Sequence, residues 1–124
     1  MAERTAIVTG GRRGIGAAIG ASLAKVGYNV LLVDVAEDDD ARAALAAIRL
    51  SGVAAGFHPA DISAIDGHAA ILEAAARLPG KLRCLVNNAG VTSLVRGDML
   101  ALTPESYDRV MRINLRGAFF LSQA

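Results

Sequence analysis

The chain has 124 residues, which is room for one domain, and 53% of them are hydrophobic, enough to bury a core. The formal net charge of +1, with acids and bases interspersed, gives no electrostatic sign of a nucleic-acid or anionic-membrane partner. A single cysteine, Cys84, excludes an internal disulfide. With no signal-peptide pattern and no apolar run near the about 18 residues of a membrane span, we expect a cytoplasmic protein.

Short apolar runs alternate with helical patterns along the whole chain. Strands are predicted at residues 6–8, 29–33, 53–57 and 82–86, and helices at residues 15–26, 38–51 and 64–78, with a last helix beginning at Thr103. Glycine follows the first helix at Gly27, and Thr103-Pro104 supplies a cap and a first-turn proline for the last one. Near-continuous apolar strands joined by helices predict a Rossmann-type α/β fold, a doubly wound parallel sheet.

Glycines gather between the first strand and the first helix, in the run Thr9-Gly-Gly-Arg-Arg-Gly-Ile-Gly16. Glycines at this place allow a tight turn and a close approach of the backbone to a ligand. The helix that follows offers free N–H groups and a partial positive charge to a diphosphate. The run therefore predicts a dinucleotide site at Gly10, Gly14, Ile15 and Gly16, and a tight turn without a ligand is the alternative.

Asp34 ends the second predicted strand, where a carboxylate can accept both hydroxyls of an adenosine ribose and would repel a 2′-phosphate. Arg13 favours the opposite cofactor, NADP, because a guanidinium in the glycine turn could bind a 2′-phosphate. This guanidinium could equally be solvated or pair with the diphosphate. Position favours Asp34 as the residue beside the ribose, so NAD is predicted over NADP. A solvated or helix-capping aspartate is the alternative for Asp34.

Four motifs in one order resemble the short-chain dehydrogenase/reductase family across nearly the whole chain. They are the glycine run ending at Gly16, Ala60-Asp61-Ile62, Asn87-Asn-Ala-Gly90 and the Asn114 segment Ile-Asn-Leu-Arg-Gly. The chain is most similar to 3-oxoacyl-reductase-like and polyol- or sugar-dehydrogenase members. The resemblance implies that Asp61 and Ile62 lie by the adenine ring, and that Asn88, Ala89 and Gly90 contact the cofactor.

Asn114 shares one helical face with Tyr107, Met111, Ala118 and Leu121, in the middle of an apolar stripe. An amide in such a stripe must be hydrogen-bonded, or it costs about 1–3 kcal/mol. The resemblance implies that Asn114 is the catalytic asparagine, which kinks its helix and helps to hold a water in a proton relay. An amide with a purely structural role is the alternative.

Other polar residues receive structural interpretations. His58 and His68 have no cysteine or carboxylate at ligand spacing, so we expect surface or helix-face positions and no metal site. Arg109, Arg112 and Arg116 are expected along the exposed side of the last helix.

The family's reaction also requires a serine and a Tyr-x-x-x-Lys pair, which neither Tyr28 nor Tyr107 begins. We therefore interpret residues 1–124 as an incomplete NAD(P)-binding Rossmann domain, truncated after the fourth strand and the following helix. The parent protein is expected to be an oxidoreductase that transfers a hydride between nicotinamide and a small carbonyl or secondary alcohol, as a homodimer or homotetramer. A non-catalytic dinucleotide-binding fragment is the alternative for the chain alone.

Overall fold

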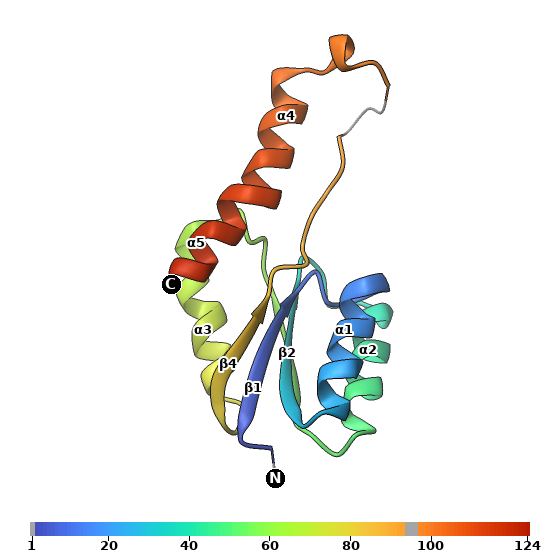
Figure 1. The fold of residues 1–124 in the computed structure, drawn as a ribbon, viewed down its shortest axis with the longest axis vertical. Helices are drawn as coiled ribbons and strands as arrows, with labels where there is room; N and C mark the ends of the chain where they lie inside the picture. Colours follow the sequence, from blue (N-terminus) through green and yellow to red (C-terminus); the bar gives the residue numbers. More distant parts are fainter. Residues whose placement is uncertain (1, 94–96) are drawn as a thin grey trace.

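A four-stranded parallel sheet, in the order β3-β2-β1-β4, forms the centre of the computed structural model, which describes residues 2–93 and 97–124 (Figure 1). The strands are β1 (Arg4–Thr9), β2 (Tyr28–Asp34), β3 (Ala55–Pro59) and β4 (Lys81–Val86). The helices are α1 (Gly14–Lys25), α2 (Asp39–Arg49), α3 (His68–Ala76), α4 (Pro104–Met111) and α5 (Ala118–Gln123). Shorter turns are the 3-10 helices η1 (Ile65–Gly67) and η2 (Met99–Ala101) and the π-helix η3 (Arg112–Gly117). The Rossmann-type prediction is confirmed.

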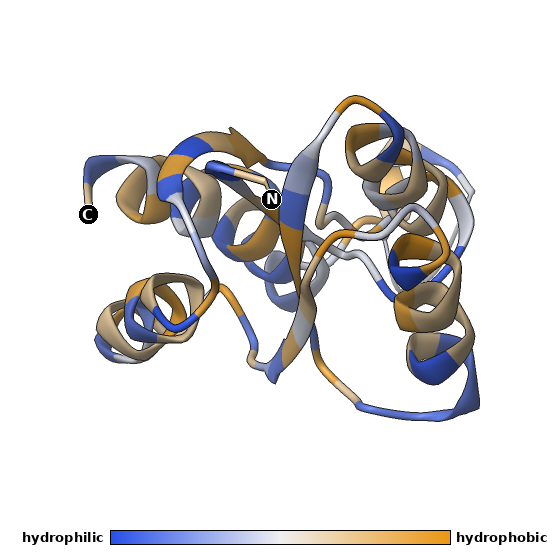
Figure 2. Ribbon diagram, turned by 90° about the horizontal axis from the view of Figure 1, so that it is seen from below, coloured by the Kyte–Doolittle hydropathy of each residue, from blue (hydrophilic) through white to orange (hydrophobic). Residues whose placement is uncertain are grey.

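Helices cover both faces of the sheet, with α1 and α2 on one side and α3 and α5 on the other (Figure 1). Alternate residues of a strand point to opposite faces, so β2 supplies Val30 and Leu32 to one core and Leu31 and Val33 to the other. Figure 2 shows the same arrangement from below, with hydrophobic and hydrophilic residues alternating around the helices. The two cores therefore hold the sheet from both sides.

The inner strands β1 and β2 are largely buried, whereas β4 is partly exposed. Val8 and Leu32 have no exposed surface, and burying a side chain of this size stabilises the fold by about 1.5–3 kcal/mol. Among the described residues β4 pairs only with β1, and Leu82 on it is 43% exposed. Within the described sheet, β4 is therefore an edge strand.

The last helix begins as predicted and then departs from the prediction. Thr103 caps α4, because its hydroxyl accepts a hydrogen bond from the Ser106 amide at 3.2 Å, and Pro104 occupies the first turn. The predicted single helix is interrupted by η3, and α4 rises beyond the sheet while α5 returns to α3 (Figure 1). Periodicity could not reveal the π-helical turn, because it adds a residue to a turn without changing which residue types are helical.

The boundaries of the third strand and of the third helix also differ from the predictions. The third strand begins at Ala55 instead of Val53, because the Ala54 amide donates to the Asn29 side chain at 3.0 Å and lies before the ladder. The third helix begins as the 3-10 turn η1 and ends at Ala76 instead of Leu78. No helix in the described ranges is long and apolar enough to cross a membrane.

Candidate functional site

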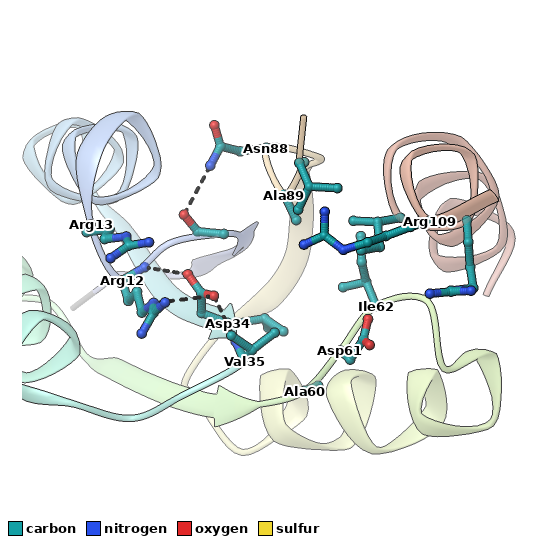
Figure 3. A pocket seen from close by; sticks show the side chains of 16 residues that line it. Arg12, Arg13, Asp34, Val35, Ala60, Asp61, Ile62, Asn88, Ala89 and Arg109 are labelled. Carbon is teal, nitrogen blue, oxygen red and sulfur yellow. Dashed lines mark hydrogen bonds and ion pairs between the residues drawn. The ribbon is translucent and has the colours of Figure 1, made fainter. Parts of the chain in front are cut away.

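A cavity of about 560 Å³ lies at the carboxyl ends of the strands, where ligands bind in open α/β sheets (Figure 3). The predicted residues that line it are Gly10, Arg13, Asp34, Asp61, Ile62, Asn88, Ala89 and Gly90. Gly14, Ile15, Gly16 and Asn114 do not line it. The structure thus gathers residues from all four strand ends around one space.

The glycine turn enters α1 in a conformation that favours glycine. Gly10 and Gly14 have φ angles of 63° and 57°, in the left-handed region, and the Gly10 amide donates to the Val33 carbonyl at 2.7 Å. A Cβ on Gly16 would overlap the Gly10 carbonyl oxygen, so glycine there lets the helix pack against the turn. The first turn of α1 has no acidic residue and no side-chain cap, which leaves its positive end available to an anion.

Ile15 lies on the outer side of α1. Its side chain is 74% exposed and lines a separate apolar groove with Ala18, Leu23 and Val26. The Ile15 side chain therefore does not take part in the cavity. Its main chain belongs to the first turn of α1.

Thr9 joins the end of β1 to the turn after β4, a role that sequence reasoning missed. Its hydroxyl donates to the Val86 carbonyl at 3.3 Å and accepts from the amides of Asn88 at 3.1 Å and Ala89 at 3.0 Å. The Asn88 side chain in turn donates to the Gly10 carbonyl at 3.1 Å (Figure 3). A buried hydroxyl at the end of an apolar strand was the available signal.

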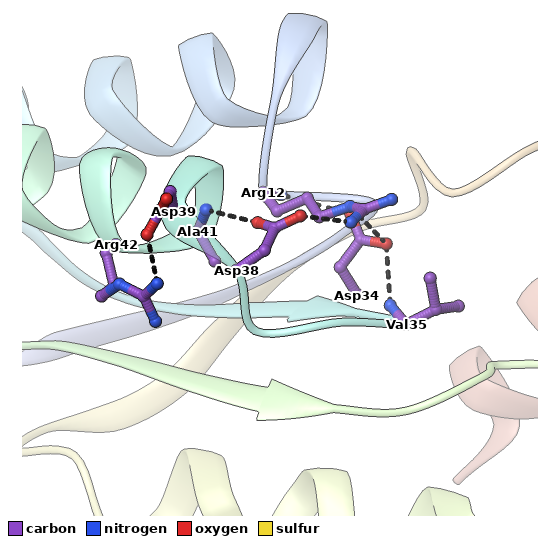
Figure 4. A network of polar contacts seen from close by, with 7 residues as sticks. All are labelled: Arg12, Asp34, Val35, Asp38, Asp39, Ala41 and Arg42. Atoms are coloured by element: carbon purple, nitrogen blue, oxygen red, sulfur yellow. Dashed lines mark hydrogen bonds and ion pairs between the residues drawn. The ribbon is translucent and has the colours of Figure 1, made fainter.

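Asp34 is held at the cavity wall by main-chain donors. Its Oδ2 accepts from the Arg12 amide at 3.3 Å and its Oδ1 from the Val35 amide at 2.8 Å. The Arg12 guanidinium also approaches it, with Nε 3.6 Å from Oδ1, and donates to Asp38 at 2.6 Å (Figure 4). The arginine that pairs with Asp34 is therefore Arg12, whereas Arg13, the one considered from the sequence, is exposed.

Asp61 and Ile62 follow β3 at the opposite wall. The Asp61 carboxylate accepts from the Ser63 hydroxyl at 2.7 Å and the Ser63 amide at 2.9 Å, and these bonds, the hydroxyl's first, lower the pKa of Asp61. The Ile62 side chain is buried in the core, at 4% exposure, so its main chain is the part that can reach a ligand.

His68 is more buried than a surface position would be. It begins α3 with 3% exposure, and its Nε2 lies 2.7 Å from the Ile62 carbonyl oxygen. The expectation of a surface or helix-face position is met by the helix position of His68, whose ring is buried against the Ile62 carbonyl. Within the described residues, no group of three or more His, Cys, Asp and Glu side chains could hold a metal ion.

Asn114 lies in η3, exposed, and is hydrogen-bonded in both directions. Its Oδ1 accepts from the Val91 amide and its Nδ2 donates to the Val91 carbonyl, each at 2.8 Å. A hydrogen-bonded amide was predicted, but a position buried within an apolar stripe is wrong: Tyr107 on the same face is 53% exposed, while Leu121 is buried. Asn114 thus ties the π-helical turn to the chain that leaves β4.

Two arginines of the last helix line the cavity, and one of them, Arg109, departs from the predicted exposed position. Arg109 is half-buried and donates to the Thr92 carbonyl at 3.2 Å, and both Arg109 and Arg112 line the cavity. Arg112 and Arg116 are exposed as predicted, and Arg116 lies over the Phe120 ring at 5.5 Å. The direction of a helix that projects over the sheet edge is a tertiary property, so sequence periodicity did not reveal it.

The cavity therefore combines positive charge with carboxylate acceptors. Arg12, Arg13, Arg109 and Arg112 supply the charge, and Asp34 and Asp61 supply the acceptors. Such a lining suits an elongated polar ligand that carries both hydroxyl and phosphate groups.

Comparison with known proteins agrees with this geometry. Residues 4–124 match the family model for short chain dehydrogenases. A trihydroxynaphthalene reductase from Pestalotiopsis fici is 34% identical over 97% of this chain and 42% of the relative. A 2-dehydro-3-deoxy-D-gluconate 5-dehydrogenase from Dickeya dadantii is 32% identical over 97% and 46% of the two chains. The chain thus spans less than half the length of these relatives.

Solved structures give the same result. The 3-oxoacyl-[acyl-carrier protein] reductase from Brucella melitensis in complex with NAD has a TM-score of 0.86 and 39% identity, covering 100% of this chain and 48% of that one. An NAD⁺-bound xylitol dehydrogenase has a TM-score of 0.89 and 28% identity, covering 99% and 46%. Fold, motif order and family match converge, and the chain belongs to the short-chain dehydrogenase family of oxidoreductases.

Proposed function

We propose that the protein to which this chain belongs transfers a hydride between a nicotinamide dinucleotide and a carbonyl or secondary-alcohol substrate. The observation that carries the proposal is the single cavity in which the glycine turn, Asp34, Asp61 and Asn88 meet. Family membership supports the reaction class. When bound, the cofactor supplies or accepts the hydride.

The residues of the cavity fit the adenosine and diphosphate portions of such a cofactor. The main chain of Gly10, Gly14, Ile15 and Gly16 would hold the diphosphate at the positive end of α1, which has no side-chain cap. Asp34 would accept the ribose hydroxyls, and Asp61 with Ile62 would lie at the adenine ring. Asn88, Ala89 and Gly90 would form the wall on the β4 side.

We propose NAD as the preferred cofactor and NADP as the weaker one. The support is Asp34, whose carboxylate is oriented by two main-chain amides at the cavity wall and would repel a 2′-phosphate. Arg12 and Arg13 reduce this repulsion, so the preference needs a direct test. Tighter binding of NADPH than NADH in a fluorescence titration, or unchanged discrimination in Asp34→Ala, would contradict the role of Asp34.

For residues 1–124 alone we propose cofactor binding without turnover. Asn114 is the one residue of the family's catalytic set that the chain supplies, and no Tyr-x-x-x-Lys occurs in the sequence. In the whole protein, Asn114 would help to hold the water of a proton relay, with Val91 orienting its amide.

The comparisons do not favour a non-catalytic module, and reading the coding sequence downstream of Ala124 tests it against the enzyme. A serine followed about a dozen residues later by Tyr-x-x-x-Lys would support the enzyme, and a stop codon would support the module. A cytoplasmic homodimer or homotetramer is the assembly that we propose for the whole protein.

A further inference from the structure

The guanidinium of Arg12 stands beside Asp34 but is anchored elsewhere. Its Nη1 donates to Asp38 Oδ2 at 2.6 Å, whereas its Nε lies 3.6 Å from Asp34 Oδ1 and makes no hydrogen bond with any described residue (Figure 4). The Arg12 side chain is only 16% exposed. Asp38 therefore fixes the direction of the only cation that the structure places within 4 Å of Asp34 among the described residues.

Asp34 does not depend on that guanidinium for its own orientation. Each of its carboxylate oxygens accepts a hydrogen bond from a main-chain amide, one from Arg12 and one from Val35. A change in the direction of the Arg12 side chain would thus leave the ribose acceptor in place and alter only the charge beside it.

Asp38 is itself held by two hydrogen bonds. It caps α2, with Oδ1 accepting from the Ala41 amide at 3.0 Å, while Oδ2 faces Arg12. One oxygen of Asp38 thus caps α2, and the other forms the ion pair with the Arg12 guanidinium.

We propose that the Arg12–Asp38 ion pair determines cofactor preference, by keeping the Arg12 guanidinium from reaching a phosphate on the ribose that Asp34 holds. The inference rests on the proposed function, because it requires adenosine ribose at Asp34. A ligand without a 2′-phosphate gains nothing from this guanidinium. A ligand with a 2′-phosphate must compete with Asp38 for it and also meets two carboxylates.

The test uses ADP-ribose and its 2′-phosphorylated form, which carry the adenosine and diphosphate groups without nicotinamide, in calorimetric titrations of the full 124-residue chain. Asp38→Asn keeps a capping oxygen for α2 but removes the acceptor and charge that hold Arg12. We expect 2′-phospho-ADP-ribose to bind about tenfold more tightly to Asp38→Asn, the effect of one charge-assisted hydrogen bond at a partly exposed site, with little change for ADP-ribose.

Two controls isolate the mechanism. Asp39→Asn removes an equal charge from the neighbouring residue, whose carboxylate pairs with Arg42 instead, and should leave both affinities unchanged. In the double variant Arg12→Ala/Asp38→Asn, the gain for the 2′-phosphorylated ligand should disappear.

An unchanged affinity in Asp38→Asn, an equal gain in Asp39→Asn, or a gain that persists without Arg12 would overturn the inference while leaving the proposed function intact. If the unaltered chain bound neither ligand, the proposed function would fail first and the inference with it.

Discussion

Gly16 marks the closest approach between α1 and the turn that precedes it. A Cβ there would overlap the Gly10 carbonyl oxygen and lie 2.6 Å from the side-chain nitrogen Nδ2 of Asn88. We expect Gly16→Ala to lower the free energy of unfolding by about 1–3 kcal/mol, because the helix must move away from the turn. Gly67→Ala is the matched control, since nothing lies within 4 Å of its added Cβ, and equal losses in urea unfolding would contradict the packing argument.

Thr9 connects two loops that are far apart in the chain. Thr9→Val keeps the shape of the side chain but leaves the amides of Asn88 and Ala89 without their shared acceptor. We expect a loss of about 1–3 kcal/mol in unfolding free energy, the cost of buried donors without partners. Thr92→Val, at an exposed position, should change stability by less than about 0.5 kcal/mol, and a similar loss there would refute the explanation.

At the scale of elements, the α2 cap makes stability depend on pH. The hydrogen bond from the Ala41 amide, with a further contribution from Arg12, lowers the pKa of Asp38 below its usual 3.8. The stability that this carboxylate contributes is therefore present above pH 3.8 and is lost as the pH falls through the lowered pKa. Unfolding of Asp38→Asn should show a weaker decline in stability over that acidic interval, and an unchanged pH profile would count against the cap.

The side chain of Asn114 attaches the π-helical turn η3 to the chain after β4, through two hydrogen bonds to the main chain of Val91. Asn114→Ala removes both hydrogen bonds, each with a net contribution of about 1 kcal/mol. We expect the Val91 amide to exchange with deuterium several-fold faster, while Gln123→Ala, at an exposed position in α5, leaves its rate unchanged. Equal rates in the two variants would show that the segment is held by other contacts.

Local patterns predicted the elements better than they predicted the site. The apolar runs of β1 and β2 and the cap at Thr103 are properties of neighbouring residues, so they could be identified without a structure. The pairing of Arg12 with Asp34 and Asp38 depends on how two loops meet.

The same limit applies to the far wall of the cavity. Arg109 faces it because α4 leaves the sheet at a particular angle, and the exposure of Asn114 follows from the π-helical turn. The spacing of residues in the sequence predicts neither the direction of α4 nor the π-helical turn η3. Motif residues could therefore be assigned to the cavity, while the charges that surround them could not.

At the scale of the whole molecule, several large apolar side chains have little cover. Ile15 on α1 is 74% exposed and Val26, which follows α1 as its C-cap, is 62% exposed. Leu115 on η3 and Phe119 on α5 are 57% and 61% exposed. We expect the isolated chain to self-associate as concentration rises, as seen by sedimentation velocity. Leu115→Lys/Phe119→Lys should reduce this association, whereas Arg83→Lys, an exposed charge-preserving change on β4, should not; no dependence on concentration would refute the expectation.

The strand order has a consequence for synthesis on the ribosome. β1 emerges first yet lies inside the sheet, between β2 and β4. It acquires β2 early, but its other edge waits until Val86 has left the exit tunnel. The glycine turn, Asp34 and Asp61 can therefore assemble as one wall while the Asn88 wall is still being translated. The first strand to be made is the one whose neighbours are completed last.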